Sequence, residues 1–132
     1  MKRFTDWPAR LAAYLEQHRA TPFAWGENDC AVFAAGAVKA ITGVDLLPAD
    51  RWQSVREASR AIVRLGGLRA ALDARLPAVP VAYAQRGDVL LVTGPRVQLA
   101  IADADGWLAP SRAGLVRGRM DCAIAAWGVG RG

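Results

Sequence analysis

Cys30 is the residue in this sequence that is best placed to do chemistry. It follows Asn28 and Asp29 and begins an apolar stretch that predicts a buried helix. At a helix N-terminus, unpaired backbone N–H groups and the positive end of the helix dipole stabilise a thiolate, so we expect a lowered thiol pKa. Such a thiolate is a candidate nucleophile, and the same N–H groups could hold an oxyanion. The alternative is a structural cysteine, because small buried cysteines are common in protein cores.

A cysteine nucleophile needs a base, and the sequence contains a single histidine, His18. His18 ends the predicted first helix, and we expect a solvated or capping residue there. It could act as a substitute base for Cys30 only if the first helix lies over the start of the second.

The cysteine count limits other chemistry. Cys30 and Cys122 are too few for a disulfide scaffold or a self-contained zinc site, and we expect no metal or cofactor. The first residues lack the apolar segment of a secretory signal, which predicts a reducing compartment and free thiols. No apolar run approaches the ~18 residues of a membrane span.

The net charge of +5 is carried mostly by arginine. Arg56, Arg60 and Arg64 recur every four residues on the predicted third helix, either as a solvated face or as a phosphate-binding stripe. No helix-turn-helix, zinc-finger or RNA-binding signature accompanies them, so nucleic acid is the less favoured partner. Arginines and exposed tryptophans suit a protein partner better, because both residue types are enriched at interface hot spots.

The elements that position these residues change character half-way along the chain. Apolar residues at helical spacing predict helices over 9–18, 29–42, 55–65 and 68–76, the second of them buried and central. For the third helix we expect an inner face of Val55, Ala58, Ile62 and Leu65. Strands are predicted over 88–92, 97–102, 107–109, 114–116 and 123–129, with a hairpin turn at 103–106. Helices followed by antiparallel strands indicate one α+β domain over 1–132, with a helical half at about 5–76 and a sheet half at about 79–129.

Three motifs together resemble the NlpC-type cell-wall cysteine peptidases, which have a papain-like fold. Trp25-Gly26 followed by Asp29-Cys30 and an apolar helix is similar to that family's nucleophile motif. Arg86-Gly87-Asp88 matches the stretch that opens its first core strand, and Gln98-Leu99-Ala100-Ile101, leading to Gly106, lines up with its second core strand. The resemblance covers about residues 23–129. It implies N-terminal helices packed on an antiparallel sheet, Cys30 at the nucleophile position, and binding positions at Trp25, Asp29 and Asp88.

The sequence departs from this family at the other catalytic positions. Gln98 stands where the family has its histidine base, and a glutamine cannot accept the thiol proton near neutral pH. The polar residue that orients that histidine should fall near Ala109. We therefore expect Cys30, Gln98 and Ala109 to line a relic cleft or a groove that holds a peptide, without catalysis.

The sequence also resembles small proteins encoded in the tail regions of phages and prophages. The shared pieces are Phe23 to Gly26, Asp29-Cys30, Phe33 to Ala35 and Thr42 to Asp45. This resemblance implies a structural or assembly component of the tail tip or baseplate, located in the virion tail and in the host cytoplasm during assembly. Its partners would be other tail and baseplate proteins, and a peptidoglycan peptide if the groove is occupied.

Two alternatives stay open on the sequence. The first is an active cysteine hydrolase that cleaves peptidoglycan stem peptides during phage entry, with Cys30 as nucleophile and a base from His18 or a partner chain. The second is a basic nucleic-acid-binding module that uses Arg56, Arg60 and Arg64.

Overall fold

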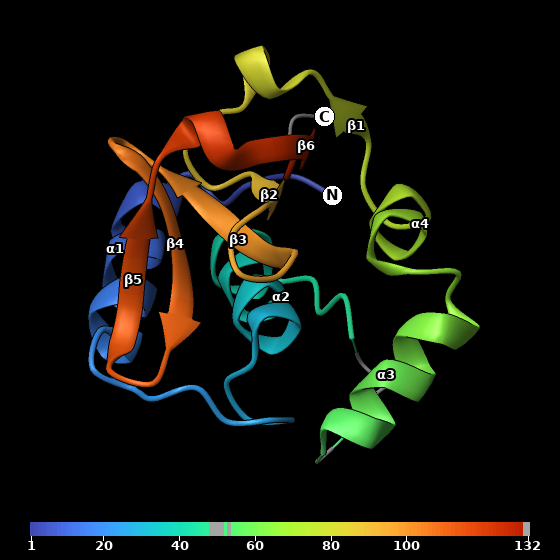
Figure 1. The fold of residues 1–132 in the computed structure, drawn as a ribbon. Helices are drawn as coiled ribbons and strands as arrows, with labels where there is room; N and C mark the ends of the chain where they lie inside the picture. Colours follow the sequence, from blue (N-terminus) through green and yellow to red (C-terminus); the bar gives the residue numbers. More distant parts are fainter. Residues whose placement is uncertain (48–51, 53, 131–132) are drawn as a thin grey trace.

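The computed structural model describes residues 1–47, 52 and 54–130, which form four α-helices followed by a six-stranded antiparallel sheet (Figure 1). The helices are α1 (Trp7–His18), α2 (Cys30–Thr42), α3 (Val55–Arg64) and α4 (Leu68–Asp73). The strands are β1 (Ala78–Val79), β2 (Val89–Val92), β3 (Gln98–Asp103), β4 (Gly106–Ser111), β5 (Gly114–Gly118) and β6 (Ala123–Trp127). Short 3₁₀ turns, η1 (Val81–Tyr83) and η2 (Met120–Cys122), precede β2 and β6. The predicted α+β class is confirmed.

The sheet has the strand order β1-β6-β2-β3-β4-β5, and every neighbouring pair is antiparallel. Strands β2 to β5 follow one another as hairpins, and β6 returns to pair between β1 and β2. The two-residue strand β1 was not predicted, because Ala78–Val79 lies between two prolines and is too short for an alternating pattern.

Helix α2 lies at the centre of the fold, as the sequence predicted. The Asp29 carboxylate caps its first turn, and Gly43 ends it in the left-handed conformation at φ 82°. Its small residues let α1 approach closely, since a Cβ at Gly36 would lie 2.2 Å from the Tyr14 hydroxyl. That hydroxyl donates a hydrogen bond to the carbonyl of Phe33 at 2.8 Å.

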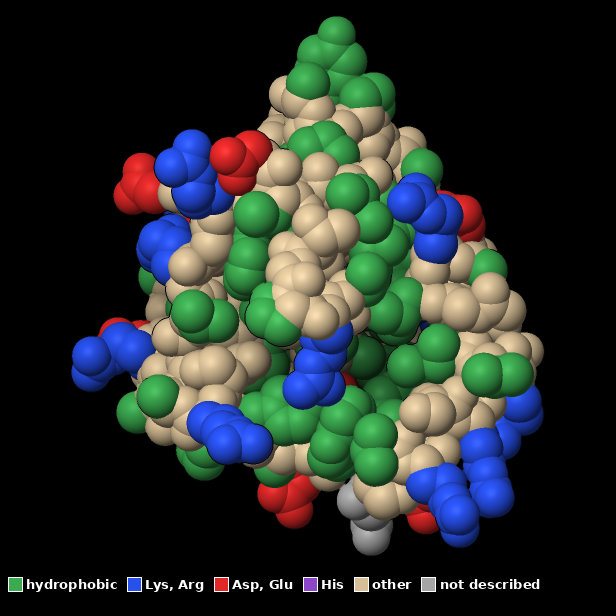
Figure 2. Space-filling model, viewed as in Figure 1, with side chains coloured by type: hydrophobic (Ala, Val, Ile, Leu, Met, Phe, Trp, Pro, Cys, Tyr) green, Lys and Arg blue, Asp and Glu red, His purple; other side chains and the backbone are tan. Residues whose placement is uncertain are grey.

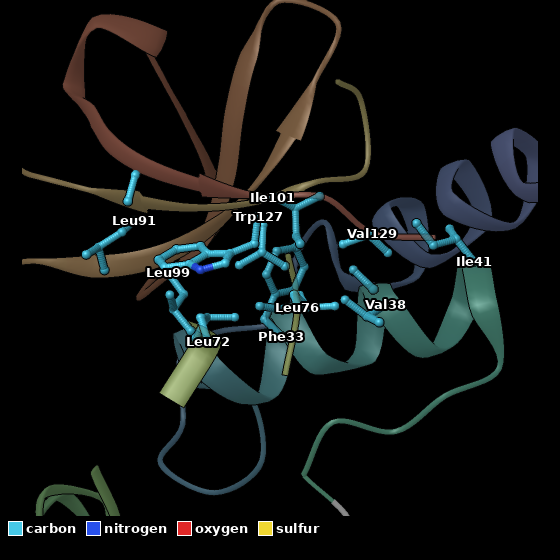
Figure 3. Close-up of a cluster of buried hydrophobic side chains, with 14 of the residues drawn as sticks. Phe33, Val38, Ile41, Leu72, Leu76, Leu91, Leu99, Ile101, Trp127 and Val129 are labelled. Carbon is cyan, nitrogen blue, oxygen red and sulfur yellow. The ribbon is translucent and has the colours of Figure 1, made fainter. Parts of the chain in front are cut away.

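The sheet buries apolar side chains on both faces. The helix-side cluster contains Leu91, Leu99, Ile101 and Trp127 from the strands and Phe33, Val38 and Ile41 from α2, and Figure 3 shows Ile101 and Trp127 between the sheet and Phe33. The far-side cluster, on the opposite face, consists of Leu90, Val92, Ala100, Ala102, Trp107, Ala109 and Ala126. The division follows from strand geometry, because successive side chains point to opposite faces. Only side chains on the helix side of the sheet can therefore contact Cys30.

Helix α3 differs from the prediction in its inner face. Ala58 and Ala61 are buried there, and Ile62 and Leu65 are half-buried, but Val55 is 54% exposed. Val55 directly follows the capping residue Ser54, so it lies at the helix end rather than against the neighbouring elements. Helix α4 is also shorter than predicted and ends at Asp73.

Candidate functional site

Cys30 begins α2, as predicted, and its side chain is half-buried against the sheet. Asp29 Oδ1 accepts a hydrogen bond from the backbone N–H of Val32 at 2.9 Å, which fixes the start of the helix beside the thiol. The backbone N–H groups of Leu99 and Ala31 lie near the Cys30 sulfur and favour its ionised form. The thiol is therefore held between the first turn of α2 and strand β3.

The expected lowering of the thiol pKa is wrong, because burial raises the pKa of Cys30. The negative charge of Asp29 adds to this effect, while the N–H groups and the cation of Arg96 oppose it without reversing it. Packing against β3 removes water that a thiolate would need. Near neutral pH the site holds a neutral thiol, which is a poor nucleophile.

We predict slow alkylation of Cys30. In a Cys122→Ser variant, iodoacetamide should modify Cys30 more slowly at pH 7 than it modifies a free cysteine peptide. The alkylation rate of Cys30 should increase only at a higher pH than the rate of the peptide does, because the raised pKa shifts thiolate formation to higher pH. The same raised pKa makes the free energy of unfolding depend on pH. The contribution of the neutral thiol is fully present below the pKa of an unfolded cysteine, about 8.5, and is lost as the pH rises through the higher pKa of the folded state. Mass spectrometry of the labelled protein measures the alkylation rate of Cys30. A rate at pH 7 above that of the peptide would contradict the prediction of slow alkylation.

His18 does not supply a base to Cys30 in this structure. Its Nδ1 lies 2.9 Å from the carbonyl oxygen of Tyr14, so the neutral ring carries its proton on Nδ1. The ring stacks on Tyr14 with centroids 4.2 Å apart and meets the edge of Phe33 at 6.3 Å. It also borders a groove of about 280 Å³ whose lining does not include Cys30. Among the described residues, no imidazole is hydrogen-bonded to the thiol.

Gln98 and Ala109 do not form a cleft with Cys30. Gln98 pairs with Val92, a member of the far-side cluster, so its side chain belongs to that face. Ala109 belongs to the same cluster and is completely buried. Cys30 instead packs on the helix-side cluster with Leu99. The sheet therefore separates the residue at the nucleophile position from those at the other two family positions.

Asp29 and Trp25 are built into the fold around the helix start. Asp29 is 1% exposed, and its Oδ2 accepts hydrogen bonds from the backbone N–H of Gly26 and from Nε1 of Trp52. Trp25 meets Phe23 edge to face at 4.9 Å and packs against the cluster that contains Trp52. Sequence reasoning missed Trp52 as a partner of Asp29, because nothing in the spacing of the two residues indicates the contact. Both predicted binding residues thus position the backbone that precedes Cys30.

Asp88 lies away from Cys30 and has no exposed surface. Its backbone carbonyl accepts a hydrogen bond from the N–H of Ala102 in β3. Ala102 is three residues, or about 10 Å of strand, from Leu99, which lies beside the Cys30 thiol. Its carboxylate accepts hydrogen bonds from Arg3, Val129 and Gln85. The predicted binding position is therefore a buried anchor for both ends of the chain.

An apolar hollow of about 40 Å³ adjoins the Cys30 site on the side of α3 and α4. Ala31 and Leu99, whose backbone N–H groups lie near the thiol, form part of its wall. The rest of the lining comes from Ala34, Ala35, Leu46, Leu47, Trp52, Ile62, Leu65, Leu68, Ala71, Leu72, Arg75 and Val89. Figure 2 shows hydrophobic side chains around a depression at the centre of this face. The hollow gathers residues from both halves of the chain, so no single motif could have revealed it.

Comparison with known proteins places residues 2–129 in a single family. The chain belongs to the family described as domain of unknown function (DUF6950). No curated protein matches it.

This DUF6950 domain offers few groups for catalysis around Cys30. Within residues 1–47, 52 and 54–130, no three His, Cys, Asp or Glu side chains come together as a metal site, and Cys30 and Cys122 are free thiols. None of the helices in the described part of the chain is long and apolar enough to cross a membrane. The arrangement places a thiol with a raised pKa beside a small apolar space.

Proposed function

We propose that this protein is a non-catalytic structural or assembly component of a phage or prophage tail, at the tail tip or baseplate. Its fold is a degenerate form of the papain-like NlpC-type peptidase fold. The order of elements supports this proposal: a central helix begins with a cysteine, and an antiparallel sheet follows and packs on it. The tail assignment rests on the sequence pieces around Phe23, Cys30, Phe33 and Thr42 that resemble tail-encoded proteins.

The environment of the Cys30 thiol is the observation that supports a non-catalytic role. Burial raises its pKa, and its polar neighbours are backbone N–H groups. Gln98 lies on the other face of the sheet, and His18 is bonded to Tyr14. A thiol without a base keeps only its own small thiolate fraction, so acyl transfer would be slow.

Docking to neighbouring tail proteins would then be the function of the domain, through exposed arginines and apolar side chains. The protein would reside in the virion tail and, during assembly, in the host cytoplasm. A bound peptidoglycan peptide would add to this role without being cleaved.

The test is complementation in a phage or prophage that encodes this chain. Deleting the gene should give particles with defective tails, and a Cys30→Ala variant should restore the wild-type titre as well as a Cys122→Ala control does. Immunogold labelling of purified particles should mark the end of the tail.

A different outcome would favour the hydrolase. If purified protein cleaves muropeptides, and if Cys30→Ala remains folded but neither cleaves nor restores infection, then Cys30 is a working nucleophile. A titre unaffected by the deletion, with no label on particles, would remove the tail assignment.

A further inference from the structure

The outer face of α3 carries a slightly inclined row of arginines. Arg56, Arg60 and Arg64 are all exposed, and each is one helical step of four residues from the next. A rise of 1.5 Å per residue puts neighbouring members of the row about 6 Å apart along the helix axis. Figure 2 shows Lys and Arg side chains gathered at the corner of the molecule where Figure 1 places α3.

These three arginines have no acidic partner among the described residues. Other arginines of the chain are engaged: Arg86 and Arg117 both bind Asp103 at 3.0 Å. The row therefore presents positive charge that the described part of the fold does not neutralise.

Exposed valines run beside the arginine row. Val63 is 77% exposed and Val55 is 54% exposed, although both are large apolar side chains. Val63 also borders a shallow depression that it shares with Ser59, Arg60 and Arg64. A partner that covers Val55 and Val63 next to these arginines would gain binding free energy both from burial of apolar surface and from attraction between opposite charges.

We propose that this face of α3 binds an acidic amphipathic helix of a partner protein. A helix that lies along α3 and carries Asp or Glu every four residues would place its carboxylates at the same 6 Å spacing as the arginines. Apolar residues beside those carboxylates would cover Val55 and Val63. The inference rests on the proposed docking function and deepens it, because it names the surface that docks and the chemistry of the partner.

The same features argue against nucleic acid and membranes as the occupant. Helix α3 has no aromatic residue on which bases could stack, and its exposed Val55 and Val63 would gain nothing from a phosphate backbone. A membrane-bound helix would need a broad apolar face, whereas the buried side of α3 is already committed to the domain through Ala58 and Ala61.

The experiment uses a synthetic helical peptide with three Glu residues at four-residue spacing and Leu beside each. A peptide of the same composition with the Glu residues at other spacings is the control ligand. The protein is compared with a triple variant, R56Q/R60Q/R64Q, and with a matched variant, K39Q/R69Q/R112Q, which removes the same charge from exposed sites elsewhere. Glutamine is a good helix former, so α3 should remain folded, and circular dichroism checks this.

We expect the α3 variant to bind the spaced peptide about tenfold more weakly at low ionic strength, which corresponds to about 1.4 kcal/mol shared among the three exposed pairs. The matched variant should bind like the unmodified protein. Val63→Ser should weaken peptide binding on its own, and it also tests the surface if the triple variant does not fold.

Three results would overturn the proposal. One is absence of binding to the spaced peptide, or equal binding of both peptides. Another is an equal loss in the matched variant, which would indicate net charge alone. The third is tighter binding of duplex DNA or of phosphatidylserine vesicles than of the peptide, lost in R56Q/R60Q/R64Q but not in Val63→Ser.

Discussion

Replacing Asp88 with Asn should lower the free energy of unfolding by about 3–5 kcal/mol, the usual cost of removing one partner of a buried ion pair. The carboxylate of Asp88 has no exposed surface, and the side chain of its partner Arg3 is only 11% exposed. The substitution keeps the shape of the side chain but leaves the guanidinium without its counter-charge.

The size of the expected effect comes from how many groups depend on this carboxylate. Its Oδ1 accepts from Arg3 and from the backbone N–H of Val129, both at 3.0 Å, and its Oδ2 accepts from the N–H of Gln85 at 2.8 Å. Arg3 also donates to the carbonyls of Val129 and Arg86, each at 2.7 Å. In the Asp88→Asn variant an NH₂ group would face N–H donors, so buried groups would lose their acceptors as well as the charge.

Urea unfolding followed by circular dichroism measures this effect, with Asp6→Asn as the matched control. Asp6 also accepts from an arginine, Arg10, at 2.7 Å, but both side chains are about half exposed. Exposed pairs of this kind contribute little, so the control should unfold near the midpoint of the unmodified protein. Similar losses in the two variants would show that the buried position of Asp88 is not what matters.

Local sequence signals were enough to predict the helices and most of the sheet. Asp29 and Gly43 mark the ends of α2 by capping and by left-handed geometry, which depend only on nearby residues. The turn between β3 and β4 was likewise predicted, and the structure pairs Asp103 with Gly106 there. The inner face of α3 was wrong at Val55, because burial of that residue depends on what lies against the helix and not on its period.

The site could not be predicted to the same depth, because its chemistry depends on long-range packing. Burial raises the pKa of Cys30, and this burial comes from packing against the rest of the core, which no property of the helix start reveals. The side on which Gln98 lies depends on strand register, and a shift of one residue would place it on the opposite face.

Asp88 illustrates the same limit at a motif. The Arg86-Gly87-Asp88 stretch indicated a functional position, yet Asp88 is bonded to Arg3, which is 85 residues away in the chain. To decide whether a buried carboxylate has a structural or a binding role, its hydrogen-bond partners must be known, and these are visible only in the folded chain.

Asp29→Ala should be the most damaging single change at the Cys30 site, with a loss of about 3 kcal/mol in the free energy of unfolding. Removing an N-cap costs about 1 kcal/mol, and each buried donor left without an acceptor costs about 1–3 kcal/mol. Asp29 accepts from Val32, Gly26 and Trp52, so the variant removes the cap and two further acceptors together. Loosening the start of α2 should also expose Cys30 and speed its alkylation.

Two variants separate the cap from the rest of this network in urea unfolding. Ser54→Ala removes the cap of α3, where Ser54 accepts from the backbone N–H of Glu57 at 3.1 Å, and should cost about 1 kcal/mol. Trp52→Phe keeps an aromatic ring but removes the N–H that donates to Asp29, so its loss should fall between those of the other two variants. If Asp29→Ala costs no more than Ser54→Ala, and Cys30 is alkylated no faster, then Asp29 is an ordinary helix cap. In that case β3 must hold the thiol in place, because the N–H of Leu99 reaches the sulfur from outside the helix and does not depend on how α2 begins.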